Sequence, residues 1–144
     1  MSDLPTRDQY AYFLPIQTRW MDNDAYGHVN NVAYYSYFDT VANHYLIHRG
    51  GLDIENSPVI GVVAESQCTY RSPLAYPQLI EAGLRVDFLG NRSVQYGIAI
   101  FAPGANECAA YGRFVHVFVN RTSNKAVLVP PPLRTALEGI LREL

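Results

Sequence analysis

The densest group of side chains that could do chemistry lies between residues 22 and 31. It reads Asp22-Asn23-Asp24-Ala25-Tyr26-Gly27-His28-Val29-Asn30-Asn31. A carboxylate beside a helix N-terminus lies close to free backbone N–H groups, which can stabilise a developing oxyanion. Asp and Asn are also the residues that cap helices and satisfy those donors. Local chemistry therefore leaves two interpretations open, a site for acid–base or nucleophilic work and a plain capping loop.

The elements that must position this loop are predicted from periodicity. Before it, Leu14, Ile16 and Trp20 alternate with polar residues and predict a strand from Tyr12 onward. After it, an apolar stripe at helical spacing consists of Tyr34, Phe38, Val41 and Tyr45. Asn30 or Asn31 can cap this helix, and Gly50-Gly51 ends it. Further apolar residues widen the stripe, which predicts a helix that is covered on most sides.

Strands dominate the rest of the chain. Alternation predicts them over residues 59–70, 79–89, 93–101 and 109–119, with turn residues between them. Pro130-Pro131-Pro132 then opens a last helix over residues 133–144. Consecutive strands with short turns favour an antiparallel sheet. The sequence therefore predicts an α+β fold, in which about five antiparallel strands wrap a long central helix and a C-terminal helix follows.

Length and composition limit the class of protein. A chain of 144 residues predicts one domain over residues 11–144, preceded by a polar and flexible segment over residues 1–10. A net charge of -2 argues against a nucleic-acid partner. No apolar run is long enough to span a membrane, and the first residues lack a secretory signal. Cys68 and Cys108 belong to no CxxC pair, which favours reduced thiols in the cytoplasm.

Residues 19–37, with the motif Gly27-His28-Val29-Asn30-Asn31 at their centre, resemble the signature of hotdog-fold acyl-CoA thioesterases. The type is that of 4-hydroxybenzoyl-CoA thioesterase, and the motif is closer to its fatty-acyl-CoA relatives. The resemblance continues through Tyr70-Arg71-Ser72-Pro73, Leu89-Gly90-Asn91-Arg92-Ser93, Ala110-Tyr111-Gly112 and Val129-Pro130. It covers nearly the whole chain from about Pro15. It departs from many relatives after Pro73, where the usual Gly-Asp is missing. The resemblance implies the hotdog fold, which agrees with the periodicity.

The resemblance also implies roles for the loop residues. Asp24 would be the catalytic carboxylate, as general base or as nucleophile. The helix start would supply the backbone N–H of Asn31 to the thioester carbonyl. His28 and Asn30 are second-rank catalytic candidates, and Asp22 is expected to hold the loop. No cofactor is expected, because CoA is part of the substrate.

Cations are expected near the pocket mouth, because CoA carries phosphates. Arg92 is the first candidate, with Ser93 and Gly90 beside it, and Arg71 and Arg121 come next. An arginine at a strand end can equally be a solvated surface residue. Tyr34 is expected to contact the substrate as well.

Several other residues are expected to have structural or supporting roles. His44 and His48 are four apart on the helix, but no third ligand is obvious, so no metal site is predicted. Cys68 is expected to be a small buried hydrophobe, and His116 a packing or interface residue. Asp39 or Glu65 could support a catalytic acid.

Two classes of function follow from the resemblance. The first is a hydrolase that cleaves an acyl-CoA thioester, and the alternative is a non-catalytic protein that binds or senses acyl-CoA. A sensor would usually carry a further domain, for which 144 residues leave no room. Hotdog dehydratases use motifs such as His-Phe-Pro-Gly, which are absent. The exposed edge of one hotdog sheet favours pairing with a second copy, as a homodimer or a dimer of dimers.

Overall fold

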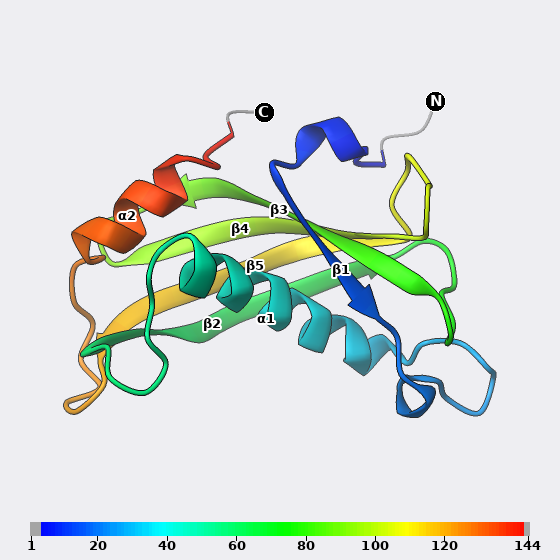
Figure 1. The fold of residues 1–144 in the computed structure, drawn as a ribbon, viewed down its shortest axis with the longest axis horizontal. Helices are drawn as coiled ribbons and strands as arrows, with labels where there is room; N and C mark the ends of the chain where they lie inside the picture. Colours follow the sequence, from blue (N-terminus) through cyan, green and yellow to red (C-terminus); the bar gives the residue numbers. More distant parts are fainter. Residues whose placement is uncertain (1–3, 143–144) are drawn as a thin grey trace.

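A computed structural model describes residues 4–142 of the chain (Figure 1). In chain order the elements are a 3₁₀ turn η1 (Arg7–Gln9), β1 (Tyr12–Gln17), a second 3₁₀ turn η2 (Trp20–Asp22), α1 (Asn31–His48), β2 (Val59–Tyr70), β3 (Leu79–Leu89), β4 (Ser93–Phe101), β5 (Ala110–Asn120) and α2 (Pro131–Glu138).

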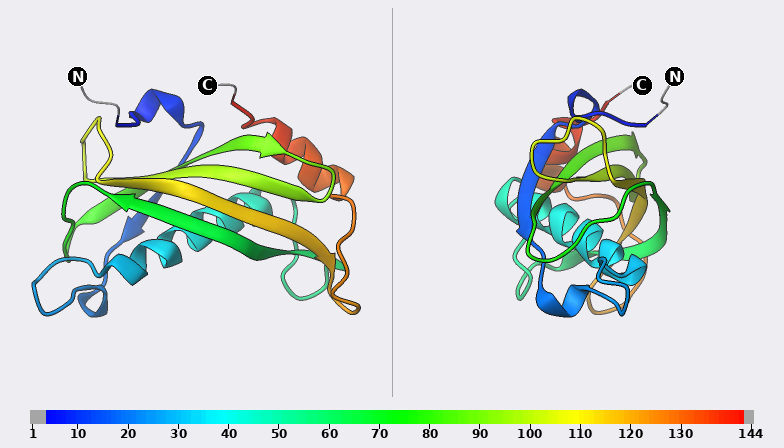
Figure 2. Two further views of the ribbon diagram at one scale, coloured as in Figure 1. Left: turned by 180° about the vertical axis from the view of Figure 1, so that it is seen from behind. Right: turned by 90° about the vertical axis from the view of Figure 1, so that its right-hand side faces the viewer.

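Within residues 4–142 the strands form one five-stranded antiparallel sheet in the order β1-β3-β4-β5-β2. The sheet curves around α1, as the view from behind and the end-on view of Figure 2 show. The predicted α+β fold is confirmed, including its long helix and C-terminal helix. None of the described helices is both long and apolar enough to cross a bilayer.

The register gives the sheet two distinct ends. Tyr70 pairs with Ala110, and β4 finishes opposite the start of β3, so these positions lie together at what we call the site end. At the opposite end, the far end, Val59 pairs with Asn120 and the β3–β4 turn connects Leu89 to Ser93. The helix α1 begins at the site end and finishes at the far end (Figure 1).

The core lies between α1 and the concave face of the sheet. Phe38, Val41 and Leu46 on the helix are completely buried, as are Leu84 and Ile98 on the strands. Burying each side chain of this size contributes roughly 1.5–3 kcal/mol relative to exposing it. This packing fixes the helix, and therefore its N-terminus, relative to the sheet.

The segment before β1 packs on the convex face of the sheet. Arg7 forms an ion pair with Glu81 and lies over the ring of Phe101, 4.8 Å from its centroid. Tyr10 is buried beside Phe101 and Cys108. The sequence predicts a flexible segment over residues 1–10. The structure describes residues 4–10 of it, and Arg7 and Tyr10 among these pack on the sheet.

Two predicted boundaries and the predicted coverage of the long helix differ from the structure. The strand β1 ends at Gln17, and Trp20 lies in η2 with 77% of its surface exposed, so Trp20 does not continue the buried alternation. The helix α2 ends at Glu138 and is followed by Gly139. The helix α1 is covered on one side only, because the opposite side leaves Val32 exposed and Ile47 partly exposed.

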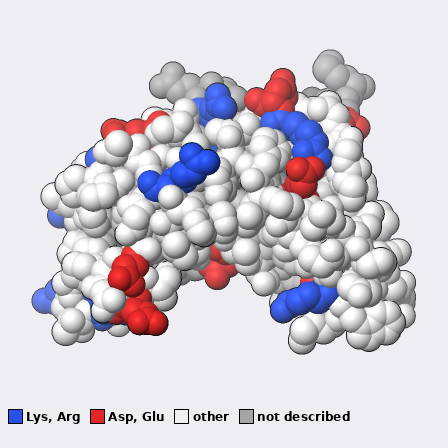
Figure 3. All heavy atoms as spheres, in the orientation of Figure 1, with Lys and Arg blue, Asp and Glu red and all other residues white. Residues whose placement is uncertain are grey.

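On the face shown in Figure 3, basic and acidic side chains are interspersed rather than gathered by sign, and the lower margin of the molecule is hollowed.

Candidate active site

Asp22 anchors the loop that carries the candidate catalytic residues. Its carboxylate accepts hydrogen bonds from the backbone N–H and the guanidinium of Arg19, and from the hydroxyl of Tyr37 at 2.7 Å. The side chain is buried, and burial alone would raise its pKa. The bonds from Arg19 and Tyr37 outweigh that effect and hold the pKa below its ordinary value. Asp22 therefore holds the loop in the way the sequence predicts.

Asp24 stands at the turn that follows. One carboxylate oxygen accepts the N–H of Tyr26 at 2.9 Å, and the Asp24 N–H donates to the carbonyl of His28 at 2.9 Å. Gly27 closes the turn at φ 79°, a backbone conformation that residues other than glycine rarely adopt. Among residues 4–142 nothing bonds the second carboxylate oxygen of Asp24, which is free to accept a proton or attack a carbonyl.

The first turn of α1 separates the roles of Asn30 and Asn31. The side chain of Asn30 accepts the N–H of Val32 at 3.0 Å, so Asn30 is the N-cap. The N–H of Asn31 has no acceptor in the described part of the chain. A free donor at a helix N-terminus is the arrangement that binds a carbonyl oxygen as it gains negative charge.

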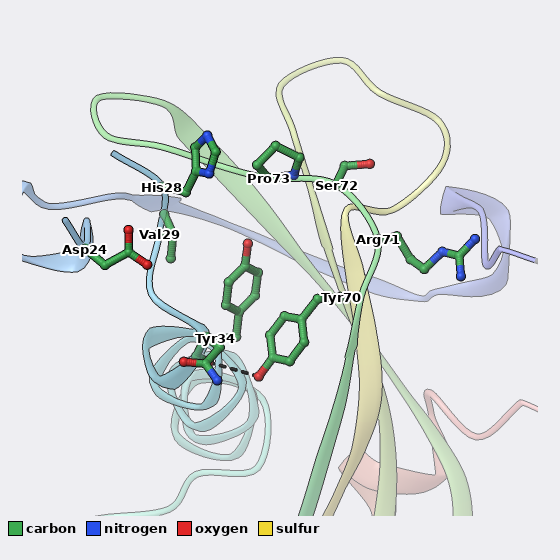
Figure 4. Close-up of a pocket in the computed structure, with 9 residues that line it drawn as sticks. Asp24, His28, Val29, Tyr34, Tyr70, Arg71, Ser72 and Pro73 are labelled. Carbon is green, nitrogen blue, oxygen red and sulfur yellow. Dashed lines mark hydrogen bonds between the residues drawn. The ribbon is translucent and has the colours of Figure 1, made fainter. Parts of the chain in front are cut away.

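These groups face a hollow of about 360 Å³ at the site end (Figure 4). Its walls are Asp24, His28, Val29, Asn31, Tyr34, Tyr70, Arg71, Ser72 and Pro73. The loop is tied to the opposite wall by the N–H of Val29, which donates to the carbonyl of Leu74 at 2.7 Å. The structure thus brings together Asp24, His28, Asn31, Tyr34 and Arg71, while Asn30 lies just behind them as the cap.

Two tyrosines form one wall of the hollow. The rings of Tyr34 and Tyr70 meet edge to face with centroids 5.1 Å apart, and the Tyr70 hydroxyl donates to the carbonyl of Asn31 at 3.0 Å. Burial raises the pKa of Tyr34 to about 12 and raises that of Tyr70 further. Both phenols are therefore neutral donors at neutral pH.

The sequence patterns place Tyr70 within a motif but assign it no role. The available signal was its place as the last residue of a strand directed at the helix start.

The structure does not place Gly90, Arg92 and Ser93 in this hollow. They form the β3–β4 turn at the far end of the sheet, where the Gly90 carbonyl accepts a bond from Arg134. Local turn signals could locate this hairpin but not its distance from the loop, because that distance depends on sheet topology. Arg121 is occupied by the carbonyls of Ser57 and Ile54.

The remaining candidate residues lie outside the hollow or carry a group that is unreactive at neutral pH. Burial raises the pKa of the Cys68 thiol to about 11. His44 shares a 2.6 Å hydrogen bond with the Tyr12 hydroxyl, and residues 4–142 contain no cluster of three ligand-type side chains for a metal ion.

The two acids proposed as supporting groups also lie elsewhere. The carboxylate of Glu65 pairs with Arg113, and that of Asp39 accepts a bond from Asn43. Neither lines the hollow.

Comparison with known proteins gives matches along most of the chain. The model of the thioesterase-like superfamily matches residues 18–137. The crystal structure of the PA5185 protein from Pseudomonas aeruginosa is 58% identical over 96% of both chains, with a TM-score of 0.94. PA2801, a proposed thioesterase from the same species, is 28% identical, covers 87% of this chain and 96% of its own, and gives a TM-score of 0.78.

A 1,4-dihydroxy-2-naphthoyl-CoA thioesterase from Synechocystis shares the fold at 15% identity. The match covers 88% of this chain and 94% of that one, with a TM-score of 0.78.

Proposed function

This chain belongs to the thioesterase-like superfamily, and from that premise we propose that it hydrolyses the thioester of an acyl-CoA to the free acid and CoA. The observation that carries the proposal is that one hollow is lined by both Asp24 and Asn31. Within residues 4–142 one carboxylate oxygen of Asp24 accepts no hydrogen bond, and the N–H of Asn31 has no acceptor. The motif Gly27-His28-Val29-Asn30-Asn31 supports a fatty acyl group as the acid.

The proposed reaction needs a nucleophile and a place for the oxyanion. With Asp24 as general base, its free oxygen takes a proton from water while the water oxygen attacks the thioester carbon. The carbonyl oxygen gains negative charge and accepts the N–H of Asn31. Collapse of the tetrahedral intermediate breaks the C–S bond, and the CoA sulfur leaves with the proton from Asp24.

Asp24 as nucleophile is the second route to the same products. Its oxygen attacks the thioester carbon, expels the CoA thiolate and forms an anhydride that water then hydrolyses. After a single turnover in isotope-labelled water, label in the Asp24 carboxylate identifies the anhydride route with water attack at the Asp24 carbon, because the general-base route leaves both Asp24 oxygens unchanged.

His28 and Asn30 have different standing under this proposal. His28 is exposed on the wall of the hollow and stays a second-rank catalytic candidate. The side chain of Asn30 is occupied by the N–H of Val32, which favours a capping role over a catalytic one.

A protein that binds acyl-CoA without cleaving it is the alternative. A panel of acyl-CoA esters of varied chain length and aromaticity, with release of free thiol as readout, tests both functions. Hydrolysis of at least one ester is expected. Binding of several esters without thiol release from any of them would favour the sensor.

The proposal also covers the assembly of the protein and its location in the cell. We expect two copies to pair through β2, an edge strand of the sheet whose exposed residues include Val62 and Val63. Antiparallel pairing about a two-fold axis would carry the β3–β4 turn of one copy toward the site end of the other. By that route Gly90, Arg92 and Ser93 would contact substrate. No cofactor is required, and the cytoplasm remains the expected location.

A further inference from the structure

A second hollow of about 400 Å³ lies directly against the first. The two share Ser72 and Pro73, which follow β2 as a narrow strap. The other walls of the second hollow come mainly from the β4–β5 connection, including Asn106, Glu107 and Cys108. A ligand that fills the first hollow can therefore continue over the strap into the second without crossing the core.

Arg71 stands where the two hollows meet. It lines the first hollow, but its guanidinium points away from Asp24 and Tyr34 (Figure 4). Burial raises the pKa of the Cys108 thiol to about 11, and the charge of Arg71 acts against that rise. Arg71 directly precedes Ser72 and Pro73, the two residues that both hollows share, so its positive charge lies at their junction.

The charge of Arg71 is also not neutralised within the described chain. Its side chain is exposed, and no residue between 4 and 142 accepts a hydrogen bond from it or pairs with it. Four other arginines each have a carboxylate partner: Arg7, Arg19, Arg85 and Arg113. The second hollow also holds the carboxylate of Glu107 on its loop side, so an anion would bind at the Arg71 side of the strap.

We propose that Arg71 binds a phosphate on the pantetheine arm of the thioester substrate, and that this arm runs over Ser72 and Pro73 into the second hollow. The proposal rests on the proposed thioester hydrolysis and adds the path of the non-reacting part of the substrate. CoA and acyl carrier proteins both attach the arm through a phosphate, which is the chemistry that Arg71 would recognise.

The test compares one acyl group on two carriers, CoA and unphosphorylated pantetheine. Arg71→Gln should raise KM for the CoA ester about tenfold and leave kcat unchanged, because it removes a charge-assisted contact made equally in the ground and transition states. KM for the pantetheine ester should not change. Arg142→Gln, beyond α2, is the matched surface control and should alter neither ester. The same acyl group on an acyl carrier protein, assayed in parallel, identifies the natural carrier.

Three results would overturn the proposal. Equal penalties on the CoA and pantetheine esters would mean that Arg71 is structural. An unchanged KM for both CoA and carrier-protein esters would mean that it binds no phosphate. A phosphate-dependent penalty in Arg92→Gln but not in Arg71→Gln would assign the phosphate to the β3–β4 turn.

Calorimetric binding of CoA separates this proposal from the proposed function. Weaker CoA binding by Arg71→Gln than by the wild type would support the phosphate site even if no ester were hydrolysed. Wild-type hydrolysis of the pantetheine ester would support the proposed function even if Arg71 had no effect.

Discussion

Asp22 and Asp24 are two residues apart and have opposite environments. Asp22 is buried, with its carboxylate bonded by Arg19 and Tyr37, whereas Asp24 is partly exposed and keeps one oxygen free. A carboxylate whose oxygens are occupied can hold a loop but has no lone pair to offer a substrate. The difference assigns Asp22 to structure and makes Asp24 the residue to test for chemistry.

Asp24→Asn should abolish most activity without unfolding the protein. The amide oxygen can still accept the N–H of Tyr26, while the basic carboxylate is lost. General-base catalysis contributes typically 10²–10⁴-fold, so kcat should fall at least about a hundredfold with little change in Tm. Steady-state kinetics and thermal unfolding of the same preparation measure both quantities.

Asp53→Asn is the matched control for that variant. One oxygen of Asp53 accepts the N–H of Glu55, two residues on, in the same local arrangement as Asp24 and Tyr26, but in the loop between α1 and β2. Its kcat should match the wild type. An equal few-fold loss of kcat in both variants would identify Asp24 as a turn residue. His28 and Asn30 would then become the leading catalytic candidates.

His116 should make the stability of the protein depend on pH. Burial lowers its pKa from 6.5 to about 4, and its Nδ1 is 3.1 Å from the Tyr96 hydroxyl, while its Nε2 has no hydrogen-bond partner among residues 4–142. Below pH 6.5 the unfolded chain binds a proton that the folded chain binds only near pH 4. The free energy of unfolding should therefore fall by about 3 kcal/mol as the pH drops across this range.

Denaturant titrations between pH 7 and pH 4 measure this slope. In His116→Gln, which does not titrate, the dependence should largely disappear, whereas the exposed His48→Gln should retain it. A slope that is unchanged in His116→Gln would assign the proton uptake to other groups.

At the scale of elements, the site depends on how α1 is held against β2. The packing of Phe38, Val41 and Leu46 sets the helix axis, and the hydrogen bond from the Tyr70 hydroxyl to the Asn31 carbonyl fixes the first helical turn. Because the Asn31 N–H is the proposed oxyanion donor, a small rotation of this turn would misdirect it. Tyr70 is thus a positioning residue in the proposed reaction.

Tyr70→Phe should lower kcat about three- to tenfold and leave KM nearly unchanged. The ring keeps its contact with Tyr34, and only a hydrogen bond worth roughly 1 kcal/mol is lost. Kinetics on one acyl-CoA ester measure the effect, with Tyr111→Phe on β5, outside the hollow, as the control. A rise in KM alone would show that the hydroxyl contacts substrate rather than the helix.

At the scale of the whole molecule, the sequence predicts the fold because its signals are local. Period-two alternation located four strands to within a residue, and Gly50-Gly51 marked the end of α1. The loop from Asp22 to Asn31 was found because its residues are contiguous. The contact of Tyr70 with the helix start and the distance of Arg92 from the hollow depend on strand order and register, which local patterns do not contain.

The unpaired edge of β2 leads to the last prediction, that the protein is at least a dimer. Among residues 4–142 this strand of twelve residues pairs with β5 alone, and its exposed side chains include Val62 and Val63, at 38% and 49%. A long edge of this kind pairs readily with a second chain. Light scattering at micromolar concentration should give at least twice the mass of one chain. Val63→Lys places a charge at the expected contact and should shift the mass toward the monomer, whereas Leu128→Lys, exposed but outside β2, should not.

If sites form between copies, activity should fall with the mass in Val63→Lys alone. A wild-type monomer that hydrolyses thioesters at full rate would show that one chain suffices, and Arg92 would then have no route to the hollow.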